Sequence, residues 1–542
     1  MVPPRNTPRA GVGVGSVARL PPMLRRTRRT VTVAAIGGAS AALISCTVAP
    51  PVVAPEVPPS IAAIMDQPAY EHGRWGMSVI DIDSGETLIA LNPDEQFLTG
   101  STAKILSVTA ALDVLGADTT FTTPVIAVGD VTDGVLEGDL ILRGSGDLTL
   151  GGRTMADGTL DVPIFDHYDA NVLPGLATLT PEDPLAGLDA LAQQIAAAGI
   201  RSVEGEVLVD DRLWDPVVLD GVPISPIVVN DNLVDIVLTP GEAIGDPTTA
   251  VWRPQTAAYS LDNRVSTADA ESGFDVTITE SDGILTVTGT IPLEAEPVIQ
   301  TYQVPDPAAW ARTLFMEALA RAGVAVAADP RSPSTGELPP TAALDGMTPV
   351  AAFTSPPFSE TARLINKVSH NLGANQLPLL LAAHAGERTL AAGLAQQMTV
   401  LEAAGLSPDD VAITDGQGLP GNRITPAAMT AYLAFVTNAP YFATFLDSTP
   451  ILGVDGSLAN VLPDRDPAIG SAHAKTGTLV GQGTDTPYLL ETKALAGYLD
   501  AASGRRLAFA VFVNDVPIDE VQAVIQANTD LGSIASQLFQ LY

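Results

Sequence analysis

The sequence has few basic side chains and few of the residues that build metal sites. Its 542 residues include 27 Lys and Arg against 62 Asp and Glu, for a formal net charge of −35. Such a chain lacks the basic patch that neutralises phosphates, which argues against nucleic acid as a partner. The five histidines are scattered and show no metal-ligand spacing, so we predict no metal site. We interpret the acidity as that of a solvated surface.

A single cysteine, Cys46, excludes an internal disulfide. It follows the basic stretch 25–29 and the short apolar run 31–44. A membrane-spanning helix needs about 20 apolar residues, so this pattern predicts a secretory signal instead. The letters L-I-S-C ending at Cys46 resemble the bacterial lipobox, whose cysteine is lipidated and becomes the mature N-terminus. The alternative is ordinary cleavage near Ala42, with Cys46 incidental. The Pro-rich stretch 47–59 predicts an extended tether.

Lysine is also rare, and the four lysines are Lys104, Lys367, Lys475 and Lys493. A lysine inside a motif is therefore informative, and arginine cannot replace it as a base because it stays protonated. Lys104 follows Ser101 by three residues, which places both on one face of the helix predicted up to Gly116. A serine at a helix start is commonly an N-cap. The adjacent lysine favours a second interpretation, a nucleophile beside its base.

Two later motifs complete a set. Ser369-His370-Asn371 follows a predicted helix, and Lys475-Thr476-Gly477-Thr478 opens a predicted strand. Alone, the first could be a polar helix end, and the second an edge strand that contains a glycine. In chain order, however, S-x-x-K, S-x-N and K-T-G are the motifs of penicillin-binding proteins and class A β-lactamases. The sequence therefore resembles the penicillin-recognising serine acyltransferases.

The interval between the first two motifs narrows this resemblance. Residues 121–348 predict short strands with Gly and Asp turns and two helices, for which class A β-lactamases have no room. The chain resembles the low-molecular-mass class C penicillin-binding proteins, the D-alanyl-D-alanine carboxypeptidase/endopeptidase family, which carry such an insertion. Further similar stretches are 146–150, 230–232, 366–367, 415–419, 453–456 and 495–498. We expect three parts, namely a signal peptide and tether (1–59), a catalytic domain (60–120 with 349–542) and a β-rich insertion of one or two lobes (121–348).

The resemblance implies an α/β (α+β) fold of the serine β-lactamase/transpeptidase type, with a five-stranded antiparallel sheet between helices. Two terminal hairpins and the stretch 471–480 would supply the strands. It also implies that Ser101 attacks the carbonyl of the penultimate D-Ala and that a neutral Lys104 accepts its proton. Ser369 would relay a proton to the leaving D-Ala. Burial beside a cation such as Lys475 would lower the pKa of Lys104.

The same resemblance implies the substrate-binding residues. Asn371 would orient the peptide amide, and Lys475 with Thr476 would hold the terminal carboxylate. The backbone N–H of Thr478, after Gly477, would form the oxyanion hole together with that of the nucleophile. No metal or organic cofactor is implied.

We therefore expect a hydrolase, a serine D-Ala-D-Ala carboxypeptidase/endopeptidase that acts on peptidoglycan stem peptides through an acyl-enzyme and is acylated by β-lactams. It would be exported to the outer face of the cytoplasmic membrane, either lipid-anchored or secreted. Three departures from the family pattern are His370 inside S-x-N, Thr99-Gly100 before the nucleophile, and the extra residues 483–492 within the K-T-G hairpin. They leave two alternatives, a catalytically weak envelope protein that binds peptidoglycan or β-lactams, and a β-lactamase or esterase on the same fold.

Overall fold

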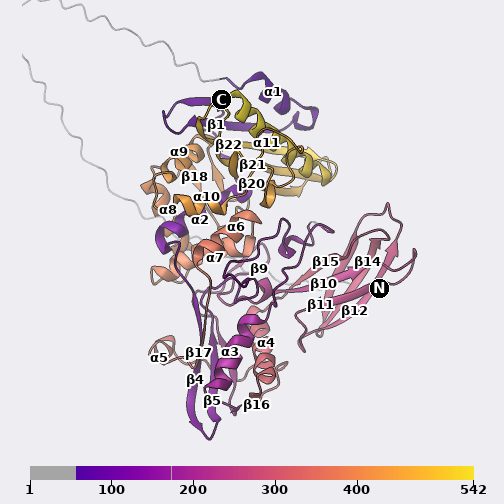
Figure 1. Ribbon diagram of the computed structural model, residues 1–542, viewed down its shortest axis with the longest axis vertical. Coiled ribbons are helices and arrows are strands. Elements are labelled where there is room, and N and C mark those ends of the chain that lie inside the picture. Colours follow the sequence, from indigo (N-terminus) through magenta and orange to yellow (C-terminus); the bar gives the residue numbers. More distant parts are fainter. Residues whose placement is uncertain (1–55, 173) are drawn as a thin grey trace, which may run out of the picture. The chain divides into compact units, whose positions relative to one another are not determined.

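The computed structural model describes residues 56–172 and 174–542. Within this part, strands from both ends of the chain form one five-stranded sheet in the order β2-β1-β22-β21-β20, and every pairing in it is antiparallel (Figure 1). The strands are β1 (Arg74–Asp81), β2 (Thr87–Leu91), β20 (Ala472–Gln482), β21 (Tyr488–Asp500) and β22 (Arg506–Ile518). The expected sheet and fold class are confirmed.

The central strand β22 is apolar on both faces because helices cover both. Side chains alternate between the faces of a strand. Phe509, Val511 and Val513 pack with helices α1 (Pro59–Met65) and α11 (Gln522–Leu541). The intervening Ala508, Ala510 and Phe512 pack instead with α9 (Pro426–Val436). This continuous apolar run therefore reflects a strand sandwiched between two helical layers.

Helix α2 (Ala103–Leu115) lies at the centre of the second helical layer. It contacts α6 (Phe358–Lys367), α7 (Asn371–His384), α8 (Leu390–Ala403) and α10 (Phe442–Ser448). Every α2 residue from Ala103 to Leu112 is buried. Ser101 lies just before α2, in a 3₁₀ turn over Gly100–Thr102, and the residue at the N-cap position of α2 is Thr102. The N-cap interpretation of Ser101 is therefore wrong.

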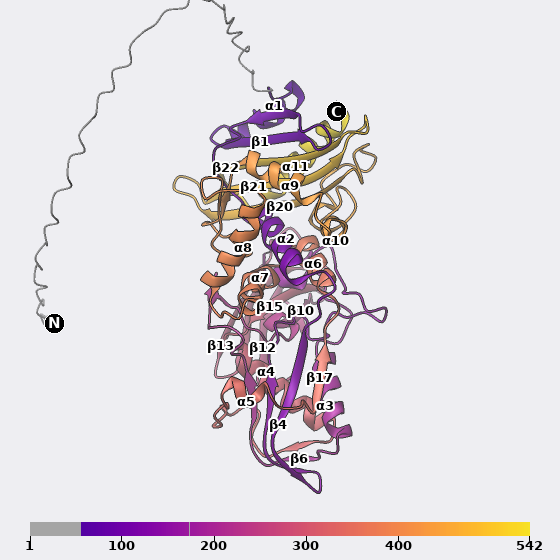
Figure 2. The ribbon, with the colours of Figure 1, turned by 90° about the vertical axis from the view of Figure 1, so that its left-hand side faces the viewer.

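The chain between α2 and α6 forms three further sheets. One has the order β16-β6-β5-β4-β17 with β7 beside β5, and the other two are β11-β10-β15 and β12-β14-β13 (Figure 2). Helices α3 (Ala186–Ala197) and α4 (Pro307–Arg321) share one apolar core with them. The strands are β4 (Thr122–Thr132), β5 (Val135–Arg143), β6 (Ser202–Val203), β7 (Val207–Asp210), β10 (Leu233–Thr239), β11 (Thr249–Arg253), β12 (Ser260–Ala268), β13 (Asp275–Ser281), β14 (Ile284–Pro292), β15 (Val298–Gln303), β16 (Ala325–Val326) and β17 (Ala351–Thr354).

The remaining elements are short. They are β3 (Phe97–Leu98), which joins β19 (Arg423–Ile424) and β18 (Val411–Ala412), the pair β8 (Val218–Leu219) and β9 (Val222–Pro223), and α5 (Thr341–Leu344). None of the described helices combines the length and the apolar character that crossing a membrane requires. Cys46 and the predicted signal lie outside the described residues.

Two details differ from the sequence expectations. The single strand expected over 203–210 is two strands, β6 and β7, which both run parallel to β5. The extra residues 483–492 do not simply interrupt the K-T-G hairpin of β20 and β21, because Gln482 pairs with Tyr488 and the ladder continues from there. Much of the added chain therefore lengthens β21, and the intervening loop is short. A bulge between Leu479 and Val480 accommodates the change in register.

Candidate active site

The first motif forms a serine–lysine pair. The Lys104 Nζ lies 2.7 Å from the Ser101 Oγ, since the two residues are one helical turn apart. Ser101 is half-buried and Lys104 is fully buried. The same Nζ donates to the Asn371 Oδ1 at 2.7 Å and lies 3.4 Å from the Ser369 Oγ. The structure thus brings the first two motifs together although they are far apart in the chain.

The third motif reaches the same point from β20. The Lys475 Nζ donates to the Ser369 Oγ at 2.9 Å and to the Thr476 carbonyl at 3.0 Å, and Lys475 is fully buried. The Ser369 hydroxyl therefore lies between two lysine amines. Ser369 has a φ of +63°, a left-handed conformation that non-glycine residues rarely adopt. This single residue turns the chain from α6 into α7 and brings its hydroxyl between the amines.

Burial sets the charge of both amines. It lowers the pKa of Lys104 to about 7, although the carboxylates of Asp169 and Asp415 act in the opposite direction. Burial, with the positive charge of Lys104 and Lys493, also holds the pKa of Lys475 well below its ordinary value. The expected burial is therefore the main cause of the lowered pKa of Lys104, and the charges of Lys104 and Lys475 disfavour each other. A neutral Lys104 offers a lone pair to the Ser101 proton.

Two glycines allow β20 to pass against the nucleophile turn. A Cβ on Gly477 would lie 2.3 Å from the Thr99 carbonyl oxygen, and a Cβ on Gly100 would lie 2.7 Å from the Thr478 nitrogen. Both distances are too short for any side chain, and Gly100 also has a positive φ of +48°. The backbone of Thr478 therefore lies beside the residue that precedes Ser101, the arrangement that an oxyanion hole requires.

The hydroxyls that follow the K-T-G lysine are also held. The Thr476 Oγ1 lies 2.9 Å from the Ser457 Oγ, and the Thr478 Oγ1 accepts a hydrogen bond from the Lys493 Nζ at 2.8 Å. Lys493 is one of the four lysines, but no sequence motif predicts a role for it. Its contact depends on the pairing of β20 with β21, which no local motif signals.

A loop over residues 415–419 closes the site from a third side. The Asp415 Oδ1 accepts hydrogen bonds from the backbone N–H groups of Gln417, Gly418 and Leu419 at 2.9, 2.7 and 3.2 Å. The Gln417 carbonyl oxygen, held in this way, lies 3.4 Å from the Lys104 Nζ. The sequence analysis noted this stretch as similar to the family, without predicting that it contacts the lysine.

His370 joins the site to a buried ion-pair cluster. Its Nδ1 accepts from the Gly373 N–H at 3.1 Å and so caps α7, which means that any hydrogen of a neutral ring is on Nε2. That Nε2 lies 3.5 Å from the Asp231 Oδ1. Asp231 in turn accepts from Arg153 at 2.5 Å and contacts the His167 Nε2 at 2.9 Å. The chain between α2 and α6 therefore contacts the middle residue of S-x-N.

The carboxylates of this cluster are neutralised by protein groups. Asp166, His167 and Asp231 have ligand atoms within 4.8 Å of one another, close enough to hold a metal ion. Arg153, however, donates to both Asp166 oxygens at 2.6 and 2.8 Å. Burial opposes a charged His167, but the carboxylate of Asp235 and its other acidic neighbours prevail and raise its pKa to about 10. Two buried cations thus occupy the place a metal would take, and we interpret the group as an ion-pair cluster.

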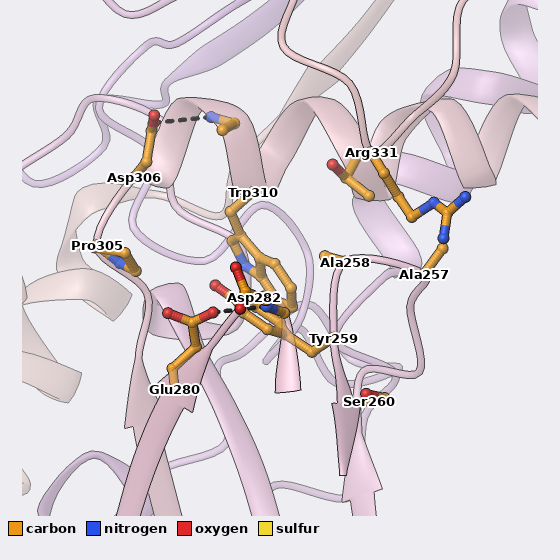
Figure 3. Close-up of a pocket in the computed structure, with 13 residues that line it drawn as sticks. Ala257, Ala258, Tyr259, Ser260, Glu280, Asp282, Pro305, Asp306, Trp310 and Arg331 are labelled. Carbon is orange, nitrogen blue, oxygen red and sulfur yellow. Dashed lines mark hydrogen bonds between the residues drawn. The ribbon is translucent and has the colours of Figure 1, made fainter. Parts of the chain in front are cut away.

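A separate cavity of about 520 Å³ lies between β12, β13 and α4 and contains none of the motif residues (Figure 3). Tyr259 and Trp310 line it together with acidic side chains. Glu280 accepts from the Gly283 N–H at 2.8 Å, and Asp306 caps α4 through the Ala309 N–H at 2.9 Å. These two carboxylates are therefore occupied by local backbone contacts.

Comparison with known proteins identifies the chain at family level. Residues 58–532 match the D-Ala-D-Ala carboxypeptidase 3 (S13) family. A D-alanyl-D-alanine carboxypeptidase from Actinomadura is 31% identical over 486 residues, which cover 85% of this chain and 81% of that protein. The D-alanyl-D-alanine carboxypeptidase DacB of Haemophilus influenzae is 21% identical over 489 residues, or 85% of this chain and 89% of the relative.

Solved structures show the same fold. The crystal structure of penicillin binding protein 4 (dacB) from Haemophilus influenzae aligns with a TM-score of 0.66 at 19% identity, covering 89% of this chain and 99% of that one. The family match spans the Ser101, Ser369 and Lys475 motifs and the sheets between them. The expected function is confirmed at this level, and the two alternatives are not favoured. The chain belongs to the D-Ala-D-Ala carboxypeptidase 3 (S13) family and is a serine-type DD-peptidase.

Proposed function

We propose that Ser101 is the nucleophile of this peptidase and Lys104 its general base. The Ser101 Oγ attacks the carbonyl carbon of the penultimate D-Ala, and its proton passes to the neutral Lys104 Nζ at 2.7 Å. The negative charge that develops on the carbonyl oxygen is stabilised by the backbone N–H groups of Ser101 and Thr478. The single observation that carries this proposal is the short contact between a half-buried hydroxyl and a fully buried amine.

The second step transfers a proton to the leaving group. When the peptide bond breaks, the D-Ala nitrogen takes a proton from the Ser369 hydroxyl, which is replenished from the lysine on either side of it. Asn371, held by Lys104, orients the peptide amide. Lys475 and Thr476, with Gly477 and Thr478 after them on β20, form the carboxylate side of the site. Water then hydrolyses the Ser101 ester, with Lys104 as the base that activates it.

The substrate we propose is the peptide of peptidoglycan, cleaved either at its terminal D-Ala or at a cross-link. A β-lactam would acylate the same Ser101, because its strained amide presents an equivalent carbonyl. The chain would divide into a catalytic domain (60–120 with 349–542) and an insertion (121–348). Strand β17 lies just beyond residue 348, but it pairs with β4 and so belongs to a sheet of the insertion.

We also propose export to the cell envelope through the signal that precedes Cys46, with a lipid on Cys46 as the membrane anchor. Support comes from the sequence pattern and from a family whose substrate lies outside the cytoplasmic membrane. Replacement by Cys46→Ser should move the protein from the membrane fraction to the soluble envelope fraction. If wild type and variant fractionate alike in the soluble fraction, the anchor is refuted and simple secretion remains.

The nucleophile is tested by mass spectrometry of the intact protein after reaction with benzylpenicillin. The wild type should gain one covalent penicilloyl group on Ser101, and it should release D-Ala from an acylated D-Ala-D-Ala peptide. Ser101→Ala should do neither, whereas the exposed control Ser503→Ala should behave like the wild type. An adduct mapped to any other residue in the wild type would contradict the proposal.

A further inference from the structure

Lys493 is a buried lysine without an acidic partner. It lies on β21 directly opposite Thr478 of β20, and 4% of it is exposed. Lysines buried to this degree are normally paired with a carboxylate. Lys367 follows this rule, with Asp455 at 2.6 Å, whereas no carboxylate in the described part of the chain forms an ion pair with Lys493. Its partner is the neutral Thr478 hydroxyl, 2.8 Å away.

The pairing of β20 with β21 places Lys493 behind the threonines of the third motif. Alternation along a strand puts Thr476 and Thr478 on one face of β20 and Lys475 on the other. Lys475 accordingly reaches Ser369. Lys493, as the cross-strand neighbour of Thr478, shares the face of the two threonines. The two lysines thus serve opposite faces of the strand.

The hydrogen bond from Lys493 orients the Thr478 hydroxyl. A protonated lysine can only donate, so the Thr478 Oγ1 accepts from it. The hydroxyl hydrogen then remains free to donate to a third group. Thr478 is half-buried and thus accessible from the site, and the neighbouring Thr476 hydroxyl is held by Ser457. A hydroxyl donor backed by a cation can bind an anion.

We propose that Lys493 is a positioning residue for the C-terminal carboxylate of the peptide substrate. It orients the Thr478 hydroxyl toward that carboxylate and places a positive charge behind it. Lys475 contributes to the same side of the site, but its amine is also engaged by Ser369 in the proton transfers. This inference rests on the proposed function, because it takes Ser101 to attack the peptide bond that precedes the C-terminal D-Ala.

The charge of Lys493 agrees with this assignment. Burial lowers its pKa to about 7, so about half of the amine is protonated at neutral pH. A bound carboxylate favours the protonated form, so a substrate with a free C-terminus increases the positive charge at this position. Lys493 and the nearby Lys475 repel each other when both are charged. A buried amine that becomes more fully charged on binding therefore discriminates between ionised and neutral chain ends.

The test compares two peptides that differ only at the C-terminus, an acylated D-Ala-D-Ala with a free carboxylate and the same peptide as a carboxamide. In the wild type, kcat/KM should favour the carboxylate. In Lys493→Met that preference should fall by about 10- to 100-fold, the loss expected for a charge-assisted hydrogen bond. The fall should appear in the KM of the carboxylate peptide, while kcat/KM for the carboxamide stays within a few-fold. Arg505→Met, which removes a partly exposed charge, is the control and should keep the wild-type preference.

A double-mutant cycle links the effect to Thr478. If Lys493 acts through that hydroxyl, Thr478→Val should lower the preference similarly, and the double variant should lose little more. The proposal is overturned if Lys493→Met lowers kcat/KM for both peptides equally, which would indicate a purely structural role or an effect through Lys475. It is also overturned if the preference is unchanged. Should Lys493→Met fail to fold, Thr478→Val decides alone. Absence of D-Ala release from the wild type would instead refute the proposed function.

Discussion

The titration of Lys104 should control the rate of acylation. Burial lowers the pKa of this lysine from 10.5 to about 7, against the opposing effect of Asp169 and Asp415. At pH 7 roughly half of the lysine is then neutral, whereas about 3 in 10,000 would be neutral at the ordinary pKa. The fraction of neutral lysine therefore differs about 1,500-fold, which corresponds to about 4 kcal/mol in the activation free energy of acylation. Burial therefore contributes a large part of the reactivity of Ser101.

The measurement is the limiting acylation rate at saturating benzylpenicillin between pH 5 and pH 9. A neutral base is lost on acidification, so the rate should rise about 50-fold from pH 5 to pH 7 and about twofold above that. Lys104→Arg stays protonated, so at pH 7 and above it should be acylated about 10²- to 10⁴-fold more slowly than the wild type, and its rate should not rise with pH. Lys493 also has a pKa of about 7. In Lys493→Met the limiting rate should keep the wild-type midpoint in its pH dependence, and this result would assign the titration to Lys104.

A rate that is flat from pH 5 to pH 8, or a midpoint above pH 9, would refute this reasoning. So would acylation of Lys104→Arg within a few-fold of the wild-type rate. In either case a different group would accept the Ser101 proton, and the short contact between the two side chains would have a structural role only.

Three further predictions concern the framework of the site. Asp231→Asn should lower the free energy of unfolding by about 3–5 kcal/mol in urea titrations, because Arg153 and His167 each lose a charge-assisted hydrogen bond to this carboxylate, and a loss below about 1 kcal/mol would contradict the ion-pair interpretation. Gly477→Ala should lower the free energy of unfolding by about 1–3 kcal/mol and slow penicillin acylation at least tenfold, because the added Cβ would meet the Thr99 carbonyl oxygen. Acylation at the wild-type rate would show that β20 can move aside. His370→Asn should be about 1 kcal/mol more stable in thermal unfolding than His370→Ala, because Asn keeps an N-cap acceptor for α7, and equal stabilities would argue against the cap.

The linear sequence determined the fold family and indicated the residues that we propose for the site. Three short motifs in a specific order were sufficient, because each has residue types that few other chemistries require at that spacing. Ser101 and Lys104 are one helical turn apart, so their contact follows from local geometry. The pattern of β1 and the continuous apolar run of β22 likewise predicted strands of the main sheet. Local periodicity and local spacing are properties of the chain itself.

The sequence could not determine contacts between segments far apart in the chain. The left-handed Ser369 lies between two lysines only because the turn between α6 and α7 meets both α2, which carries Lys104, and β20, which carries Lys475. The pKa of Lys104 is lowered chiefly because the fold removes water from its amine. Burial of this kind is a property of the whole structure.

Tertiary structure alone also decided the roles of the less conspicuous residues. Asp231 and His370 are 139 positions apart, and their approach depends on how the inserted sheets meet α7. Lys493 resembled any other lysine until the pairing of β20 with β21 placed it, without an acidic partner, behind Thr478. Buried charges interact strongly over a few ångströms and are screened elsewhere. Their function therefore depends on positions in space, which residue spacing along the chain does not specify.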